Sequence, residues 1–223
     1  MIAVSLFDKT GAMLEPWHEA GFECWALDVQ HQFNYDNGGV TEVKPNFYKL
    51  HYDLSRPWMP PFSKDKIAFV SAFPPCDHLA VSGARWFKGK GLRKLAQSIE
   101  LFATAAEFCE WANAPYLIEN PVSNISSHWR KPDHNFHPWH FTGYESKDNY
   151  TKKTCLWTGG GFMMPEPDID NELGEPDNRI HACPPGPERA NFRSMTPKGF
   201  AKAVYIANTQ KKDVQLSLLE HQT

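Results

Sequence analysis

Four side chains that can act as acids, bases, nucleophiles or hydrogen-bond acceptors stand at or just after the ends of predicted buried strands. They are Asp8, Asp28, Cys76 and Glu119. Functional residues of an open α/β sheet gather at the carboxyl ends of its strands, so this shared position favours one common site. Each residue also has a simpler interpretation, because an Asp after a strand often caps a turn and a single Cys is often an inert apolar residue.

The segments that must position these residues alternate between strand and helix patterns. Short apolar runs predict strands over 1–7, 24–27, 48–52, 67–73, 116–118 and 153–157. Helical spacing and terminal turn residues predict helices over 12–20, 92–113 and 198–208, the last with Thr196 as its cap. The stretches 30–44, 123–149 and 165–187 are predicted as loops. This alternation predicts an α/β fold with a mostly parallel, doubly wound sheet.

Asp28 has the position of a ribose-binding acid. A carboxylate after the second strand can accept hydrogen bonds from both ribose hydroxyls of a nucleoside cofactor. The turn from Asp8 to Gly11 lacks the Gly-x-Gly-x-x-Gly pattern, which disfavours a pyrophosphate and hence NAD. A nucleoside without phosphates fits better, and the sequence therefore favours S-adenosylmethionine.

Two motifs give the sequence a resemblance to the DNA cytosine-5 methyltransferases. They are Phe73-Pro74-Pro75-Cys76 and, on the next predicted strand, Ile118-Glu119-Asn120-Pro121. Leu6-Phe7-Asp8 to Gly11 and Gly21-Phe22-Glu23 precede them, so that order and spacing fit over about residues 1–125. Over residues 65–160 the chain resembles more closely the small cytosine-methyltransferase-like proteins of phage genomes. The matching stretches are 74–86, 118–122, 130–133 and 153–157.

The resemblance implies a Rossmann-like, S-adenosylmethionine-dependent methyltransferase fold with a loop-rich C-terminal part and no full target-recognition domain. We expect one catalytic domain over 1–209, with an irregular insertion rich in His, Trp and Pro over about 123–195, and a polar tail over 210–223. The implied cofactor contacts are Phe7, Asp8, Thr10, Gly11, Asp28, Asp53, Leu54 and Pro74. The implied contacts to the nucleic acid are Ser82, Arg85, Trp86, Lys88, Lys90, Asn120, Lys152 and Lys153.

The family chemistry gives catalytic roles to Cys76 and Glu119. Carbon 5 of cytosine is a poor nucleophile, and a Cys76 thiolate that adds to carbon 6 would activate it. We therefore expect the pKa of this thiol to fall from ~8.5 toward neutrality. Glu119 would bond to N3 of the base and protonate it during the addition, which calls for a raised carboxyl pKa and predicts burial. The base must leave any duplex to reach both residues.

The segment 81–94 favours a nucleic-acid substrate. Its cations and aromatic residues are Arg85, Lys88, Lys90, Arg93, Lys94, Trp86 and Phe87. Cations can bind phosphates and an aromatic side chain can stack on or replace a base, although a solvated surface loop is the alternative interpretation. Lys152 and Lys153 could hold the target base where the larger enzymes usually carry arginines, or could be an exposed strand start. Arg193 could complete the cofactor side.

The chain departs from the family in two places. The stretch between Leu156 and Arg193 is too short for a separate domain of the usual ~50 residues or more. This predicts little sequence reading, a single-stranded substrate, or a partner that supplies specificity. Ala72-Phe73 also replaces the Gly pair that usually precedes Pro-Pro-Cys.

Two further patterns carry weaker predictions. The spacing of His134, His137 and His140 brings metal ligands together only on a helix, and Pro138 opposes a helix, so we expect packing or phosphate contacts and no metal. Gln215-Leu216-Ser217-Leu218-Leu219 resembles the short peptide by which bacterial replication proteins bind the sliding clamp, with Leu219 where Phe is more usual. Such a contact would bring the protein to newly replicated DNA, and an ordinary amphipathic end is the alternative.

Composition excludes several classes of protein. The 223 residues include 41% hydrophobic and 22% charged residues, which suits a folded domain rather than a disordered chain. We expect neither a membrane span nor a secretory signal, because the sequence has no long apolar run and no basic leader. Five cysteines without a Cys-x-x-Cys pair favour the reducing cytoplasm of a bacterial or phage-infected cell. With a net charge of −3, nucleic-acid binding requires a local basic patch.

Methylation of DNA at carbon 5 of cytosine is the leading hypothesis from these residues. The same fold could instead act on RNA or on a free pyrimidine nucleotide. The chain could also be a catalytically silent protein that binds DNA or the sliding clamp, or an enzyme that adds a different group to carbon 5.

Overall fold

Residues 1–184, 186 and 189–220 are described by the structure, a computed structural model, and they form two units. The first unit comprises residues 1–136 and 153–161. The second comprises residues 137–152 and the described residues that follow 161. No helix in the described part of the chain is long and apolar enough to cross a lipid bilayer.

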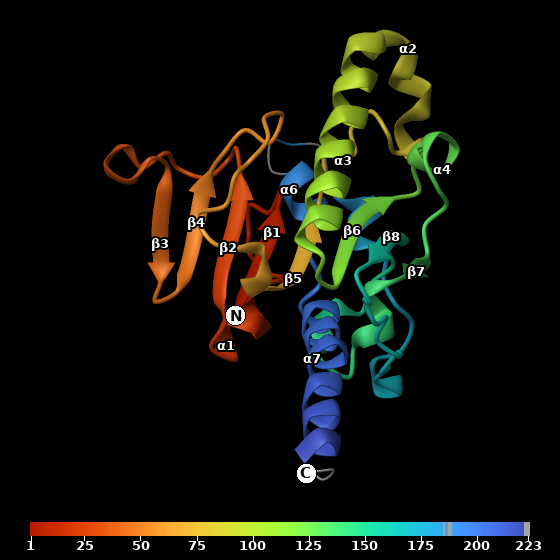
Figure 1. The fold of residues 1–223 in the computed structure, drawn as a ribbon. Coiled ribbons are helices and arrows are strands. Elements are labelled where there is room, and N and C mark those ends of the chain that lie inside the picture. The colour runs from red at the N-terminus through yellow and green to blue at the C-terminus, as the bar shows by residue number, and fades with distance from the viewer. Residues whose placement is uncertain (185, 187–188, 221–223) are drawn as a thin grey trace. The chain divides into compact units, whose positions relative to one another are not determined.

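An eight-stranded sheet organises the first unit (Figure 1). In spatial order its strands are β3 (Val40–Lys44), β4 (Phe47–His51), β2 (Glu23–Asp28), β1 (Ile2–Leu6), β5 (Ile67–Ala72), β6 (Tyr116–Pro121), β8 (Thr154–Gly159) and β7 (His134–Phe136). The five strands from β4 to β6 are parallel, whereas β3 pairs antiparallel with β4, and β8 pairs antiparallel with β6 and β7. The predicted α/β fold with a mostly parallel sheet is confirmed, and the chain winds outward from β1 in both directions.

Helices cover both faces of this sheet. Helix α3 (Leu92–Ala112) lies beside β5 and β6 (Figure 1), and its Phe102 belongs to the same buried cluster as Val70 and Ile118. Helix α1 (Glu15–Glu19) carries Trp17, which stacks on Phe69 with ring centroids 4.6 Å apart. Successive strand residues point to opposite faces, so Phe69 and Val70 show that α1 and α3 lie on different sides.

Several predicted boundaries are corrected by the structure. β3 falls in the predicted loop 30–44, because its side chains are exposed or half-buried and form no apolar run. β7 falls in the predicted loop 123–149 and has only three residues, too few for a recognisable pattern. The predicted helix 12–20 is reduced to α1, since Leu14 closes a turn on Gly11 and Pro16 fits only the first turn of a helix. The predicted strand 116–118 continues to Pro121 as β6.

Two neighbouring glycines after β8 allow a comparison of what an added side chain costs at two left-handed backbone positions. Gly160 and Gly161 both have left-handed φ values, of 61° and 81°. A Cβ atom on Gly160 would overlap the backbone carbonyl of Ala114, whereas a Cβ atom on Gly161 would meet nothing within 4 Å. We expect Gly161→Ala to cost about 1–2 kcal/mol of unfolding free energy, and Gly160→Ala about 4 kcal/mol or more. Urea unfolding of both variants measures this difference, and equal losses would contradict the predicted overlap.

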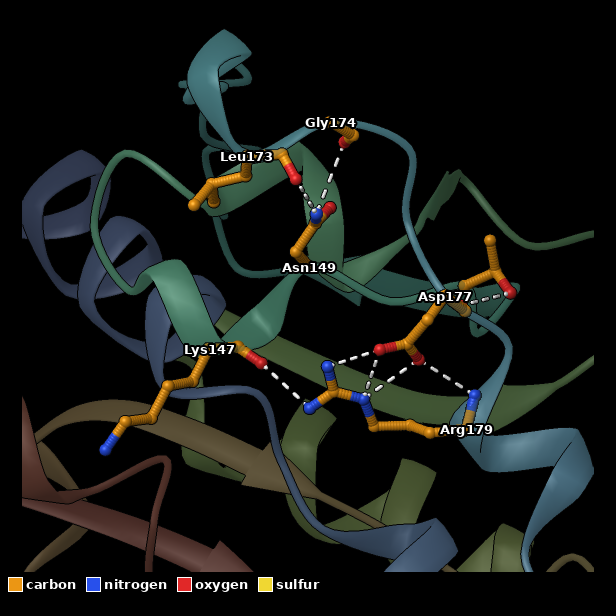
Figure 2. A network of polar contacts seen from close by, with 7 residues as sticks. Lys147, Asn149, Leu173, Gly174, Asp177 and Arg179 are labelled. Atoms are coloured by element: carbon orange, nitrogen blue, oxygen red, sulfur yellow. Dashed lines mark hydrogen bonds and ion pairs between the residues drawn. The ribbon is translucent and has the colours of Figure 1, made fainter.

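Polar contacts fix the acidic, proline-rich loop of the second unit (Figure 2). Arg179 forms a bidentate ion pair with Asp177, and its Nη1 donates to the carbonyl oxygen of Lys147 at 3.2 Å. Asn149 Nδ2 donates to the two carbonyl oxygens of Leu173–Gly174 at 3.2 and 3.3 Å. These bonds tie the loop to the segment around Lys147, which explains how it is ordered with little regular secondary structure.

The longest helix of the second unit, α7, begins at Lys198 and continues to Glu220, after the short helices α5 (Arg179–Ala182) and α6 (Arg189–Ser194). The predicted tail is therefore helical as far as Glu220, and the clamp-like side chains of Gln215–Leu219 lie outside the described residues. Gly199 N–H donates to Asp148 Oδ2 at 2.8 Å, so the observed cap is Asp148 and not Thr196. Burial raises the pKa of Asp148.

Candidate active site

The carboxyl ends of β2, β1, β5 and β6 lie next to one another in the sheet. The predicted site residues at these ends are, in the same order, Asp28, Asp8, Cys76 and Glu119. The N–H of Asp8 donates to Leu27 O at 3.0 Å, which joins the end of β2 to the turn after β1. Neighbouring strands are ~4.8 Å apart, so β2 and β5 are separated by about 10 Å. A ligand of nucleoside size could therefore extend from Asp28 toward Cys76.

The turn after β1 is held by the carboxylate of Asp8. Its Oδ1 accepts from the N–H groups of Thr10 (3.0 Å) and Gly11 (2.7 Å) and from Thr10 Oγ1 (3.0 Å), while Oδ2 accepts from Ser5 Oγ (2.8 Å). A carboxylate has about four acceptor positions, so these bonds use the capacity of Asp8. The side chain of Asp8, one of the predicted cofactor residues, therefore fixes the conformation of the turn.

Two residues of this turn have a left-handed backbone. Phe7 has a φ of 56°, which a bulky residue rarely adopts, and its half-buried ring packs against the core cluster. Gly11 has a φ of 78°, and a Cβ atom there would lie 2.7 Å from Cζ of Phe47. Strained backbone is typical of ligand-binding sites, and the cofactor position at this strand end stays a prediction.

Asp28 is buried, and hydrogen bonds within the described part of the chain use one of its two carboxylate oxygens. Its Oδ1 accepts from the N–H of Gln30 at 2.7 Å, and Oδ2 accepts no hydrogen bond from the residues that the structure describes. Burial raises the pKa of Asp28, and the Gln30 N–H and the nearby His31 act in the opposite direction. An acceptor at this strand end fits the ribose hydroxyls of S-adenosylmethionine.

Two further predicted cofactor residues follow the end of β4. Leu54 is buried in the core, whereas Asp53 is exposed. The N–H of Ser55 donates to Asp53 Oδ1 at 3.0 Å and lowers the pKa of that carboxyl group. Tyr52 N–H donates to Asp28 O at 3.4 Å, which places this segment beside the β2 end.

Asn120 links the two motifs that carry the family resemblance. Its side chain is buried, and Nδ2 donates to the carbonyl oxygen of Pro74 at 2.9 Å. This bond holds the start of the Pro74-Pro75-Cys76 segment against β6, one residue beyond Glu119. Asn120 therefore positions the segment that carries Cys76, and its predicted contact with the substrate stays a prediction.

The segment after Cys76 is anchored as well. Cys76 O accepts from the N–H groups of Leu79 (2.9 Å) and Ala80 (2.8 Å), which closes a tight turn. The N–H of Val81 then donates to Val122 O at 2.9 Å, so the exit of the turn is bound to the chain that follows β6. Cys76 itself is half-buried, and it thus stands on a loop fixed at both ends.

Glu119 is half-buried, which corrects the prediction of burial. It lies within β6 and pairs with Leu156, beyond the part of β6 that pairs with β5. Burial raises the pKa of the neighbouring Cys155 thiol. The charge of Lys153 lowers this pKa, and the charge of Glu119 raises it. The charges of Glu119 and Lys153 therefore both act on Cys155, at the start of β8.

The basic segment 81–94 is helical over most of its length, and the predicted helix 92–113 forms its last part. It forms a 3-10 helix (Val81–Trp86), helix α2 (Phe87–Lys90) and the start of α3. Ser82, Arg85 and Lys88 are exposed, and Trp86 is 61% exposed with the Arg85 guanidinium 5.0 Å from its ring centroid. Lys90 Nζ bonds to the carbonyl oxygen of Asp77, which ties the segment back to the nucleophile loop. No acidic residue occurs from position 78 to 99, so this exposed surface is positive.

Other predicted residues belong to the second unit, and their roles stay predictions. These are Lys152 and Arg193, together with His137 and His140, whose rings lie 5.7 Å apart; His134 is in β7 of the first unit. A hollow of about 420 Å³ is also part of the second unit, and none of the predicted cofactor residues lines it.

Sequence reasoning missed two positioning residues of the first unit. Arg130 Nη2 donates to Thr158 O at 3.0 Å, and its ion pair with Asp133 brings that carboxylate to the N–H of Thr158 at 2.7 Å. This contact fixes β8, which in turn holds Glu119. His31 connects the cofactor turn to β4. Both connections join residues distant in sequence, and no local pattern marks them.

No protein-family model matches the sequence, and no curated protein matches it.

Proposed function

We propose that this protein is an S-adenosylmethionine-dependent methyltransferase that methylates carbon 5 of cytosine in DNA. The observation that carries the proposal is the bond from Asn120 to Pro74 O, because it joins the two motifs behind the family resemblance. A nucleophile and a carboxylate then stand on adjacent strand ends. The order of β4, β2, β1, β5 and β6 is compatible with the doubly wound form of this fold.

Cys76 and Glu119 would carry the covalent steps. The Cys76 thiolate adds to carbon 6, and the electrons of the 5,6 double bond move toward carbon 5 while Glu119 protonates N3. S-adenosylmethionine, when bound, supplies an electrophilic methyl group for carbon 5. A base then takes the carbon-5 proton, and the bond from carbon 6 to Cys76 breaks. N3 returns its proton to the Glu119 carboxylate, which restores the aromatic ring, the thiolate and the acid.

The cofactor would occupy the strand ends next to Cys76. Asp28 offers a buried acceptor for the ribose, and the turn from Phe7 to Gly11 lies between it and the Pro74 segment. The distance of about 10 Å from β2 to β5 suits a nucleoside that must present its methyl group to a base held by Cys76.

DNA is favoured over a free nucleotide by the basic segment 81–94. Its exposed cations can bind several phosphates, and Trp86 offers a face for stacking, which a single nucleotide would leave unused. We place the reaction in a reducing bacterial or phage-infected cytoplasm, because all five cysteines are free. Binding of the sliding clamp by Gln215–Leu219 stays part of the proposal.

DNA that contains 5-fluorocytosine tests nucleophile, cofactor and substrate together. Fluorine cannot leave as a proton does, so the final elimination is blocked, and the protein should remain bound to the DNA with one added methyl group. Denaturing electrophoresis and intact mass detect this adduct. If an adduct forms only with RNA or with a free nucleotide, that molecule is the substrate instead of DNA. If the added group has a different mass, the enzyme transfers a group other than methyl. If neither an adduct nor cofactor binding is detected, a catalytically silent DNA-binding protein is favoured.

A further inference from the structure

The imidazole ring of His31 lies between two backbone carbonyl groups. His31 is buried, with Nδ1 3.1 Å from Leu50 O of β4 and Nε2 3.1 Å from Lys9 O in the predicted cofactor turn. The backbone N–H of His31 donates to Asp28 O at 3.3 Å. The His31 side chain thus connects β4 to the turn after β1, and its backbone connects to the end of β2; these three strand ends form the proposed ribose side of the cofactor site.

Both carbonyl oxygens can only accept hydrogen bonds. A neutral imidazole has one N–H, so it can donate to one carbonyl and must direct the lone pair of its other nitrogen at the second. The imidazolium ion has two N–H groups and satisfies both contacts. The observed geometry is therefore complete only when the ring carries both protons.

The surrounding charges bear on this protonated form. Asp28 and Asp8 are buried carboxylates close to one another, and His31 lowers the pKa of Asp28. On the other side, Lys49 Nζ donates to the same Lys9 oxygen at 3.2 Å. The remaining titratable neighbours are Lys9 itself and His51, whose Nδ1 lies 2.6 Å from His31 O. A cation at His31 balances the two carboxylates, while the two lysines oppose it.

We propose that His31 is a positioning residue of the cofactor site and that it works in its doubly protonated form. The imidazolium holds the Lys9 carbonyl inward, which fixes the peptide between the Asp8 and Gly11 ends of the turn. Loss of one ring proton places a lone pair against a carbonyl oxygen and releases one side of the bridge. The coupling to the cofactor rests on the proposed function, whereas the protonation of the ring does not.

Nitrogen-15 NMR of the ring measures the first part directly. In the folded protein near neutral pH, with signals assigned by comparison with His31→Gln, both His31 ring nitrogens should have the chemical shifts of protonated imidazolium. His18 is the internal control, because among the described residues its half-buried ring meets one carbonyl oxygen, that of Pro45. A single-proton ring for His31 at that pH would overturn the proposal.

Calorimetry of S-adenosylmethionine binding from pH 5.5 to 8.5 measures the second part. One linked proton predicts that the wild-type dissociation constant rises by up to about tenfold per pH unit at the alkaline end, relative to His31→Gln. The amino group of the cofactor titrates equally with both proteins, so its contribution cancels when wild type and His31→Gln are compared. The control variant His18→Gln should show the pH dependence of the wild type. Equal pH dependence in wild type and His31→Gln would overturn the coupling. Absence of binding at every pH would instead contradict the proposed function, and NMR would still decide the state of His31.

Discussion

Replacement of Cys76 by Ala is expected to abolish methyl transfer to DNA while leaving the affinity for S-adenosylmethionine unchanged. In the proposed mechanism the thiolate activates carbon 5, and loss of a covalent nucleophile costs about 10⁴-fold or more in rate. The fold of the loop should persist, because the bonds from Leu79 and Ala80 go to the backbone oxygen of Cys76, which Ala retains. Transfer of a radioactive methyl group to DNA and binding calorimetry separate the two effects.

Cys183→Ala is the matched control for this substitution. Cys183 is a free, half-buried cysteine like Cys76, but it belongs to the second unit and to none of the predicted catalytic positions. We expect this variant to methylate DNA at the wild-type rate. Wild-type activity of the Cys76 variant would rule out the covalent mechanism, and loss of cofactor binding in it would show that the change had damaged the fold.

Glu119→Gln is expected to lower the rate of methyl transfer by about 10²–10⁴-fold with little change in DNA affinity. The amide keeps the size of the side chain and can still donate to N3, but it cannot transfer a proton as the thiolate adds. Single-turnover rates with saturating DNA report the catalytic step, and titration of fluorescent DNA reports binding.

A second glutamate provides the control for the change of charge. Glu107 is exposed on α3, and its replacement by Gln removes one negative charge outside the proposed site. This variant should show the wild-type rate. An equal loss of rate in both variants would indicate a general electrostatic effect, and an unchanged rate for Glu119→Gln would remove the carboxyl group from the mechanism.

The strands that position the site could be predicted because most of them are buried and apolar. β1 and β5 each form an uninterrupted buried run, and the end of each is marked by a turn or a proline pair. The strand β3 could not be found in this way, because an edge strand with exposed side chains has the composition of a loop. Runs of apolar residues therefore identified the central strands of the sheet but not its edge strands.

The predicted site residues were found by their place at strand ends, but their individual roles depend on contacts that the sequence does not show. Asp8 was predicted to contact the cofactor, and its carboxylate is used by Ser5, Thr10 and Gly11. Asn120 was predicted to contact the substrate, and it donates to Pro74 O. These hydrogen bonds, local for Asp8 and across 46 residues for Asn120, are not revealed by composition and spacing, and the predicted ligand contacts stay predictions.

The pairing of β6 has a consequence for the order in which the molecule folds. β5 pairs with β6 only as far as Ile118, and the outer half of β6, with Glu119, is paired by β8 alone. During synthesis β1, β2 and β5 leave the ribosome long before β8, and contacts between distant segments form slowly because a long loop must close first. We therefore expect Cys76 to be part of an ordered sheet before the carboxylate next to it is fixed. Newly made chains would pass through a stage with a nucleophile but without its acid, and the two halves of the site would be completed in sequence.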